Sequence, residues 1–103
     1  MREVKGDHWV VNIGVVAPGT DALEGVGLLG TSVTATTEAE AVAELSAAEP
    51  EFVNGNRVSA FRWRDSEPDA TAADLRESFK RLKVPDEHVE PAAQSFLQFY
   101  RQE

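Results

Sequence analysis

Few residues of this chain have types and spacings suited to chemistry. The chain contains two histidines, His8 and His88, and no cysteine, so thiol chemistry, disulfides and cysteine-based zinc sites are excluded. Zinc-binding histidines occur at short, regular spacings within one motif, whereas these two lie near opposite ends of the chain. We therefore expect both histidines to be exposed and neither to bind a metal.

Other candidate motifs fail on their context. Residues 25–30 match G-x-G-x-x-G in letters, but they precede a predicted strand, whereas the dinucleotide motif follows a strand and opens a helix. The serines lack the nucleophile signature G-x-S-x-G. The neighbouring acids Glu38/Glu40 and Glu49/Glu51 are typical of a solvated helix face. The sequence therefore predicts no catalytic residue, no cofactor and no metal.

The elements that would position a site are clearest in the middle of the chain. A β-branched alternation predicts a strand over residues 27–36. Thr37 and Glu40 have the spacing of a capping box, so a helix is expected to begin there and to be stopped by Pro50. An Asn-Gly-Asn turn then leads into an alternating strand over residues 57–64.

The most hydrophobic run extends from His8 to Ala17 and has apolar side chains on both faces, which is typical of a central strand. The predicted strand order is therefore 2-1-3, with the outer strands parallel to each other. Amphipathic patterns predict two further helices, one from about Thr71 and one with Pro91 near its first turn. The predicted fold class is α+β, a small three-stranded sheet (β-β-α-β) followed by two C-terminal helices, in a single domain spanning residues 1–103.

Small side chains are expected to share one face of the sheet with Val10, Val16 and Val58. These small residues are Gly14, Gly30, Ser32 and Ala60. A face of small residues allows a helix or a ligand to approach closely. We expect the two C-terminal helices to cover this face, because apolar faces prefer burial within the chain. The alternative is that the face stays open and pairs with a second copy.

One stretch is similar to a known family. Residues 33–64, a helix followed by a turn, the letters PEFVNG and a strand that ends in FRWR, resemble the second half of YCII-like domains of the dimeric α+β barrel type. The resemblance covers about a third of the chain and implies a dimer with a small-molecule pocket. The first crossover helix of that family is not visible between Ala17 and Gly27, and no His–Asp pair stands at its proposed active site.

Charge and composition exclude several classes of function. The formal net charge is −8, which argues against nucleic acid as a direct partner, because phosphate contacts require clustered lysine and arginine. No apolar run approaches the length of a membrane span, and the first residues lack the apolar region of a signal peptide. We therefore expect a cytoplasmic protein with no membrane partner.

The remaining feature is an acidic helix. Five glutamates and no base occur between Gly27 and Gly55, and three of them, Glu38, Glu40 and Glu44, lie in the predicted helix. Like charges on one face favour either a solubilising surface or a surface that meets a basic partner. We predict the second, with Arg62 and Arg64 on the sheet as further partner-binding residues.

Three classes of function follow from these observations. The first is a small acidic, non-enzymatic protein-interaction module, such as a regulator, an inhibitor or an accessory subunit, with a homodimer as one form. The second is an acidic mimic of nucleic acid that inhibits a DNA- or RNA-binding protein. The third is a dimeric α+β-barrel-like enzyme or binding protein for a small molecule. The first is preferred, because the chain lacks an acid–base or nucleophile constellation.

Overall fold

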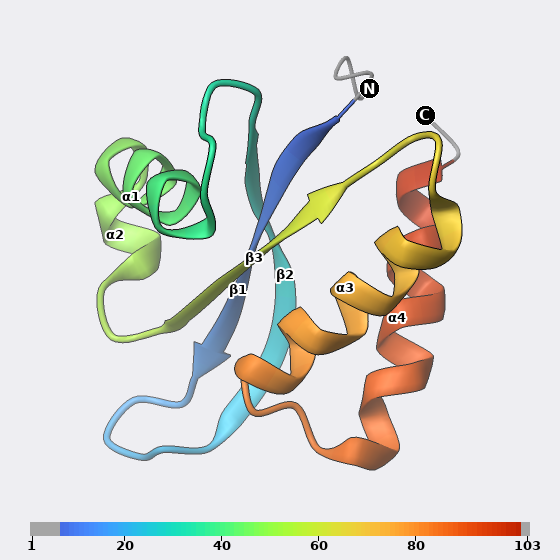
Figure 1. The fold of residues 1–103 in the computed structure, drawn as a ribbon. Coiled ribbons are helices and arrows are strands. Elements are labelled where there is room, and N and C mark those ends of the chain that lie inside the picture. The colour runs from blue at the N-terminus through green and yellow to red at the C-terminus, as the bar shows by residue number, and fades with distance from the viewer. Residues whose placement is uncertain (1–6, 102–103) are drawn as a thin grey trace.

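The computed structural model describes residues 7–101 and contains one three-stranded sheet with four helices (Figure 1). The strands are β1 (His8–Val16), β2 (Leu23–Ser32) and β3 (Arg57–Trp63), and the helices are α1 (Glu38–Ala48), α2 (Pro50–Val53), α3 (Pro68–Arg81) and α4 (Asp86–Arg101). This arrangement confirms the predicted α+β class and the two C-terminal helices. None of the helices in the described part of the chain is long and apolar enough to cross a membrane.

The sheet has the order β2-β1-β3, with β1 antiparallel to both neighbours. The prediction of a central first strand is therefore confirmed. The physical reason is visible in β1, where Val10 and Val11 point to opposite faces and are both 0% exposed. A strand that is buried on both faces must have a covering layer on each side.

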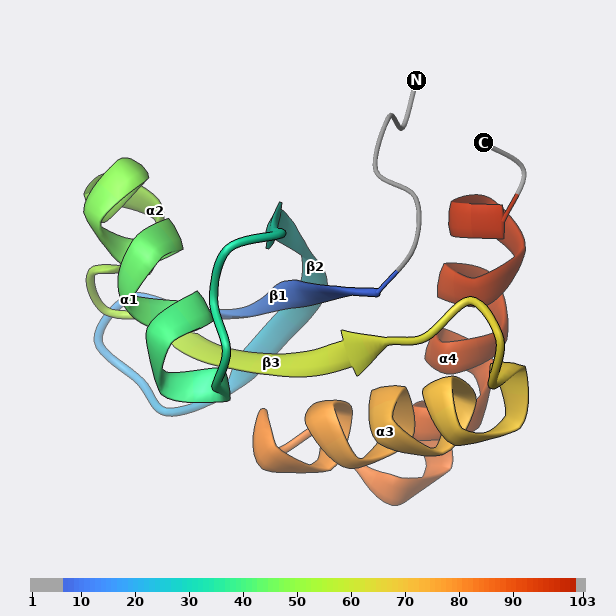
Figure 2. The same cartoon turned by 45° about the horizontal axis from the view of Figure 1, so that its top comes forward.

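Helices cover the two faces separately. Figure 2 shows the strands lying between the α1–α2 unit and the α3–α4 pair. Val10 and Phe61 pack with residues of α3 and α4, including Leu75 and Phe79, in the larger core cluster. On the other face, Val11 and its neighbours pack against α1; the buried members of this second cluster are Val11, Ala35, Ala41 and Ala60.

The predicted grouping of small residues on one face was partly wrong. Gly14 faces α3, where an added Cβ would lie 3.5 Å from Leu82 Cδ2. Gly30, in contrast, faces α1, and Ala60 belongs to the α1 cluster. The reason is register: Val10 pairs with Phe61, so Ala60 falls on the opposite face from Val10. The predicted small residues are thus split between the two faces, with Gly30 and Ala60 under α1 and Gly14 toward the end of α3.

Two boundaries also differ from the prediction. Strand β2 begins at Leu23 and ends at Ser32, because residues 23–25 pair with β1 whereas residues after 32 turn toward α1. An irregularity in the ladder leaves Leu29 without a partner on β1. Pro50 does follow the end of α1, but it is also the first residue of the short helix α2, a position where proline costs no hydrogen bond.

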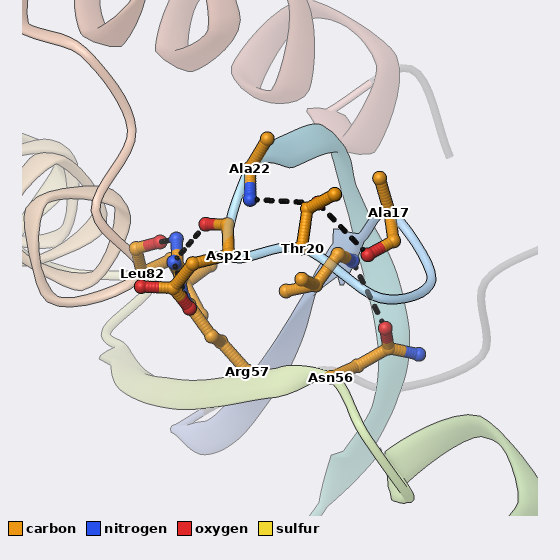
Figure 3. Close-up of polar contacts among 8 residues, drawn as sticks. Ala17, Thr20, Asp21, Ala22, Asn56, Arg57 and Leu82 are labelled. Atoms are coloured by element: carbon orange, nitrogen blue, oxygen red, sulfur yellow. Dashed lines mark hydrogen bonds and ion pairs between the residues drawn. The ribbon is translucent and has the colours of Figure 1, made fainter.

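A set of polar contacts fixes the corner where β3 begins (Figure 3). Arg57 donates to the backbone carbonyl of Leu82 at 3.1 Å and to that of Asp21 at 2.7 Å, so that one side chain links β3, the end of α3 and the β1–β2 loop. Asn56 Oδ1 accepts from the backbone N–H of Val16 at 3.0 Å. These contacts hold the end of β1 in place. They give Arg57 and Asn56 a structural role in joining the elements at this corner.

Candidate interaction surface

Side chains close part of the outer edge of β3, at Ala60 and, just beyond the strand, at Arg64. The backbone N–H of Ala60 donates to Glu38 Oε2 at 3.2 Å, and its carbonyl accepts from Arg81 Nη2 at 2.7 Å. Further along, the hydroxyl of Thr71 bonds to both the N–H and the carbonyl of Arg64, at 2.9 and 3.0 Å. Because these backbone groups already have partners, another strand cannot pair with them without displacing α1 or α3.

Two further acids of α1 are also bonded within the chain. The carboxylate of Glu40 accepts from the N–H and the hydroxyl of Thr36, both at 2.8 Å, and these bonds, the backbone one first, lower the pKa of Glu40. The carboxylate of Glu44 accepts from the hydroxyls of Ser32 and Thr34 at 2.6 and 2.9 Å. The structure thus gives Glu38 and Glu44 a part in holding α1 to the sheet and Glu40 a part in fixing the chain before α1, and the binding of the three glutamates to a partner stays a prediction.

The capping box predicted at the start of α1 is present in modified form. The hydroxyl of Thr37 accepts from the N–H of Glu40 at 3.1 Å, as expected. The Glu40 side chain bonds back to Thr36 rather than to Thr37. The contact therefore also fixes the chain before α1.

The two arginines predicted as partner-binding residues lie beside β3. The Arg62 guanidinium stands over the Trp9 ring, 5.8 Å from its centre, and Arg64 Nη1 donates to Asp74 Oδ2 at 3.1 Å. Both line a polar hollow of about 240 Å³ between α1, β3 and α3. Glu38 lines the same hollow, so the structure brings together three of the five predicted residues and places Glu40 and Glu44 elsewhere.

This polar hollow holds balanced charge. Its arginines are Arg62, Arg64 and Arg81, and its acids are Glu38, Asp74 and Glu77. Two of the arginines are ion-paired with acids of the hollow, at 3.1 and 3.3 Å. The hollow therefore presents neither the net positive field that attracts an anion nor the net negative field that attracts a basic partner.

The outer edge of β2 contrasts with that of β3. Because the backbone of Ala60 points away from β1, the alternation of an antiparallel ladder directs the backbone groups of Val10 and Gly14 toward β3. Their partners on β2 are Thr31 and Val26, whose N–H and C=O groups therefore point outward. Within residues 7–101, no group hydrogen-bonds to these outward backbone atoms. The edge of β2 is open.

An apolar hollow lies on the α4 side of β2. It has a volume of about 350 Å³, and its apolar lining residues are Val26, Leu28, Phe79, Ala92 and Phe96. Leu28 is 44% exposed, although it is large and apolar. The volume lies near the lower end of the range for small-ligand pockets.

A second hollow lies on the α1 side of the same strand. It has a volume of about 460 Å³ and is lined mainly by apolar residues, which are Ile13, Val15, Leu28, Leu29 and Phe52. Phe52 of α2 is 54% exposed, and Glu49 is the charged residue of the lining. The open edge of β2 is thus flanked by exposed apolar surface on both faces of the sheet, and such patches mark interaction sites.

Sequence reasoning placed the interaction residues on α1 and β3 and did not identify the edge of β2. A signal was present in residues 23–31, which contain Glu24 as their single charged residue, together with three glycines. Edge strands usually carry charges or prolines that prevent pairing. The apolar, glycine-containing sequence of residues 23–31 was therefore the signal that indicates an unprotected edge strand.

Within the part of the chain that the structure describes, the side chains suited to catalysis do not assemble into a site. His8 is 2% exposed and stacks beside Trp63, with ring centres 6.3 Å apart, so its predicted exposure was wrong; it pairs with Trp63 in the sheet register, beneath the C-terminal helices. His88 is exposed, as predicted. Among residues 7–101, no group of three or more histidines, cysteines or acids could hold a metal ion.

One buried polar chain lies between the sheet and α3. Ser78 Oγ donates to Ser59 Oγ at 3.0 Å, and Ser59 Oγ accepts from Arg81 Nε at 3.2 Å. Asn12 extends this chain through a long contact of 3.5 Å to Ser78. No imidazole or carboxylate of the described residues bonds to either serine hydroxyl, so neither serine has the general base that activates a nucleophile. The chain is a structural link between β1, β3 and α3.

Comparisons with known proteins gave no match: no family model fits this chain, and neither a curated protein nor a solved structure matches it significantly. The resemblance of residues 33–64 to YCII-like domains gains no support from these comparisons. In addition, β1 and β2 are joined by a short loop over residues 17–22 and not by the crossover helix of that family.

Proposed function

We propose that this chain is a small acidic protein-interaction module, without enzymatic activity, that binds another protein through the open edge of β2 and the apolar surface beside it. The observation that supports this function is the difference between the two edges of the sheet. The edge of β3 is bridged at Ala60 by Glu38 and Arg81, and just beyond the strand Thr71 binds Arg64, whereas the edge of β2 has no such bonds and is flanked by two apolar hollows.

The energetic reason is the cost of leaving such a surface in water. Large apolar side chains gain about 25 cal/mol for each Å² removed from water, and Leu28 and Phe52 are each about half exposed. Hot spots of protein interfaces lie in well-packed pockets near the centre of the contact, where the partner removes them fully from water. The cytoplasmic location expected from the sequence belongs to this proposal.

Site-specific photo-crosslinking tests the proposed function. A photoreactive amino acid in place of Leu28 should give an adduct with the same host protein in repeated experiments in cells of the source organism. The matched control places the photoreactive residue at Lys80 of α3, which is also exposed but lines neither of the two hollows beside β2. Mass spectrometry identifies the adduct, and the purified pair should then bind in solution. Equal adducts from both positions, or none from Leu28, would contradict the proposed function.

A further inference from the structure

We propose that the edge of β2 binds an extended segment of another protein as a fourth strand, and that this segment has apolar side chains at alternate positions and lysine or arginine at its ends. The inference rests on the proposed function and specifies the chemistry of the partner. It depends on the outward backbone groups of β2, on the two hollows beside it and on the charge of the surroundings.

The backbone of β2 supplies the first requirement. Thr31 and Val26 direct their N–H and C=O groups away from β1, and no described group binds them. A strand that adds to a sheet edge satisfies such groups through a backbone ladder, which gives affinity without dependence on the partner's sequence. The irregularity at Leu29 lies between Val26 and Thr31, so the added ladder would be interrupted there. A helix cannot form this ladder, because its own backbone groups are already bonded.

The two hollows supply the second requirement. Side chains of a strand alternate between the two faces of the sheet, so successive side chains of an added strand would lie toward opposite hollows. One hollow lies between β2 and α4, and the other lies between β2 and α2. Leu28 lines both, which places the hollows at the same height along the edge. An apolar segment with a period of two therefore fits this surface.

The third requirement concerns charge and decides between a different protein and a second copy. The chain carries a formal net charge of −8, and the charged residues on β2 and in the α2-side hollow are Glu24 and Glu49. A second copy would bring the same acids to the same edge, and like charges placed opposite each other are destabilising. A segment with basic ends is attracted instead.

Selection from a displayed library tests the inference. The probe is a library of random peptides of about ten residues, the upper end of usual strand lengths, panned against the purified chain at low salt. Enriched peptides should alternate apolar and polar residues and carry Lys or Arg near their ends. Synthetic copies should bind, and their affinity should fall as salt rises, because salt screens the attraction between charges.

Two proline variants locate the peptide. Thr31→Pro removes an outward N–H and obstructs an added strand, and proline is tolerated at an edge position of this kind. Its matched control is Thr31→Ala, which keeps the backbone donor. We expect Thr31→Pro to weaken peptide binding by roughly tenfold or more, because loss of one bond also misplaces its neighbours, whereas Thr31→Ala should bind normally. Circular dichroism shows whether Thr31→Pro folds. If it does not fold, Val26→Pro repeats the same test at the other outward position.

The other outcomes separate this inference from the proposed function. Enriched peptides with helical spacing, or a Thr31→Pro variant that folds and binds as well as the unchanged chain, would overturn strand addition. A dimer in sedimentation that Thr31→Pro dissociates would mean that a second copy takes the edge, and this would also overturn the inference. In each case an adduct at Leu28 with a host protein would leave the proposed function standing, whereas its absence would refute that function independently.

Discussion

Glu38 and Arg81 face each other across the outer edge of β3, with Glu38 Oε2 3.3 Å from Arg81 Nη2, and each also binds the backbone of Ala60. The pair joins the first residue of α1 to the last residue of α3 over the strand between them. Both side chains are more than 40% exposed, so the ion pair itself contributes little to stability. The pair instead protects the edge from unwanted pairing, because it occupies the backbone N–H and C=O of Ala60, with which another strand would pair.

Removal of this pair should open the second edge of the sheet. We expect Glu38→Ala/Arg81→Ala to show a coupling energy below about 1 kcal/mol in a double-mutant cycle, measured by urea unfolding. The same variant should self-associate more strongly in sedimentation velocity. Glu77→Ala/Lys80→Ala is the matched control, because it removes one acid and one base from an exposed ion pair on α3. Equal association of the two variants would contradict the assigned role.

Glycines of β2 should respond in opposite directions to added side chains. A Cβ at Gly27 meets nothing within 4 Å, so Gly27→Thr should raise the free energy of unfolding by roughly 0.5–1 kcal/mol through reduced chain entropy and better strand propensity. A Cβ at Gly30 would lie 2.5 Å from Leu45 Cδ1, so Gly30→Ala should lower it by about 1–3 kcal/mol. Urea titration of both variants measures these changes, and a shift of the same sign in both would refute the close packing of Leu45 over Gly30.

The ring of Phe96 should couple α4 to the rest of the core. It meets Phe61 and Phe79 edge to face, with ring centres 6.0 and 6.4 Å apart. Because Phe96 is half-buried, we expect Phe96→Ala to lower the free energy of unfolding by about 2–3 kcal/mol, less than the loss of a fully buried ring. An unchanged denaturation midpoint would show that α4 does not contribute to the core. The side chains of Phe99 and Tyr100, predicted on the same face, lie outside the described residues.

The contact between α3 and α4 should be sensitive to acid. Arg76 donates twice to Glu90, at 2.7 and 2.9 Å, and these bonds, together with a weaker effect of the hydrogen bond from Gln94, lower the pKa of Glu90 from 4.5 to about 2. Because the pKa is lower in the folded state, the contribution is fully present above about pH 4.5 and is lost as pH falls toward 2. The stability difference between the unchanged chain and Glu90→Gln should therefore shrink over this interval. Thermal unfolding at several pH values measures it, and a constant difference would refute the coupling.

Amide hydrogen exchange should be slower in the central strand β1 than in the edge strand β3. We expect the amides of Val11 to Val15 to exchange more slowly than those of β3, because β1 is bonded on both sides and its flanking layers are helical. The amide of Ala60 is an internal control, since its partner is the exposed carboxylate of Glu38. Faster exchange in β1 than in β3 would contradict the central role of β1 in stability.

The sequence by itself determined the class of fold and the place of the first strand. These features are encoded locally: apolar side chains on both faces of His8 to Val16 require cover on each side, and the spacing of Leu75, Phe79 and Leu82 requires a helix with one buried face. The Thr37 cap is likewise a contact between residues three positions apart. Such signals depend on neighbours along the chain, so they can be read before the fold is known.

The tertiary structure decided which face each helix covers and which edge of the sheet is open. Period-two alternation shows that Val10 and Val11 differ in face, but the partner of each is set by register, which pairs Val10 with Phe61 and Val11 with Ala60. The role of Glu38 on α1 depended on a partner distant in sequence, Arg81. Charge pattern identifies an acidic helix, whereas hydrogen-bond geometry decides whether its carboxylates are bonded within the chain.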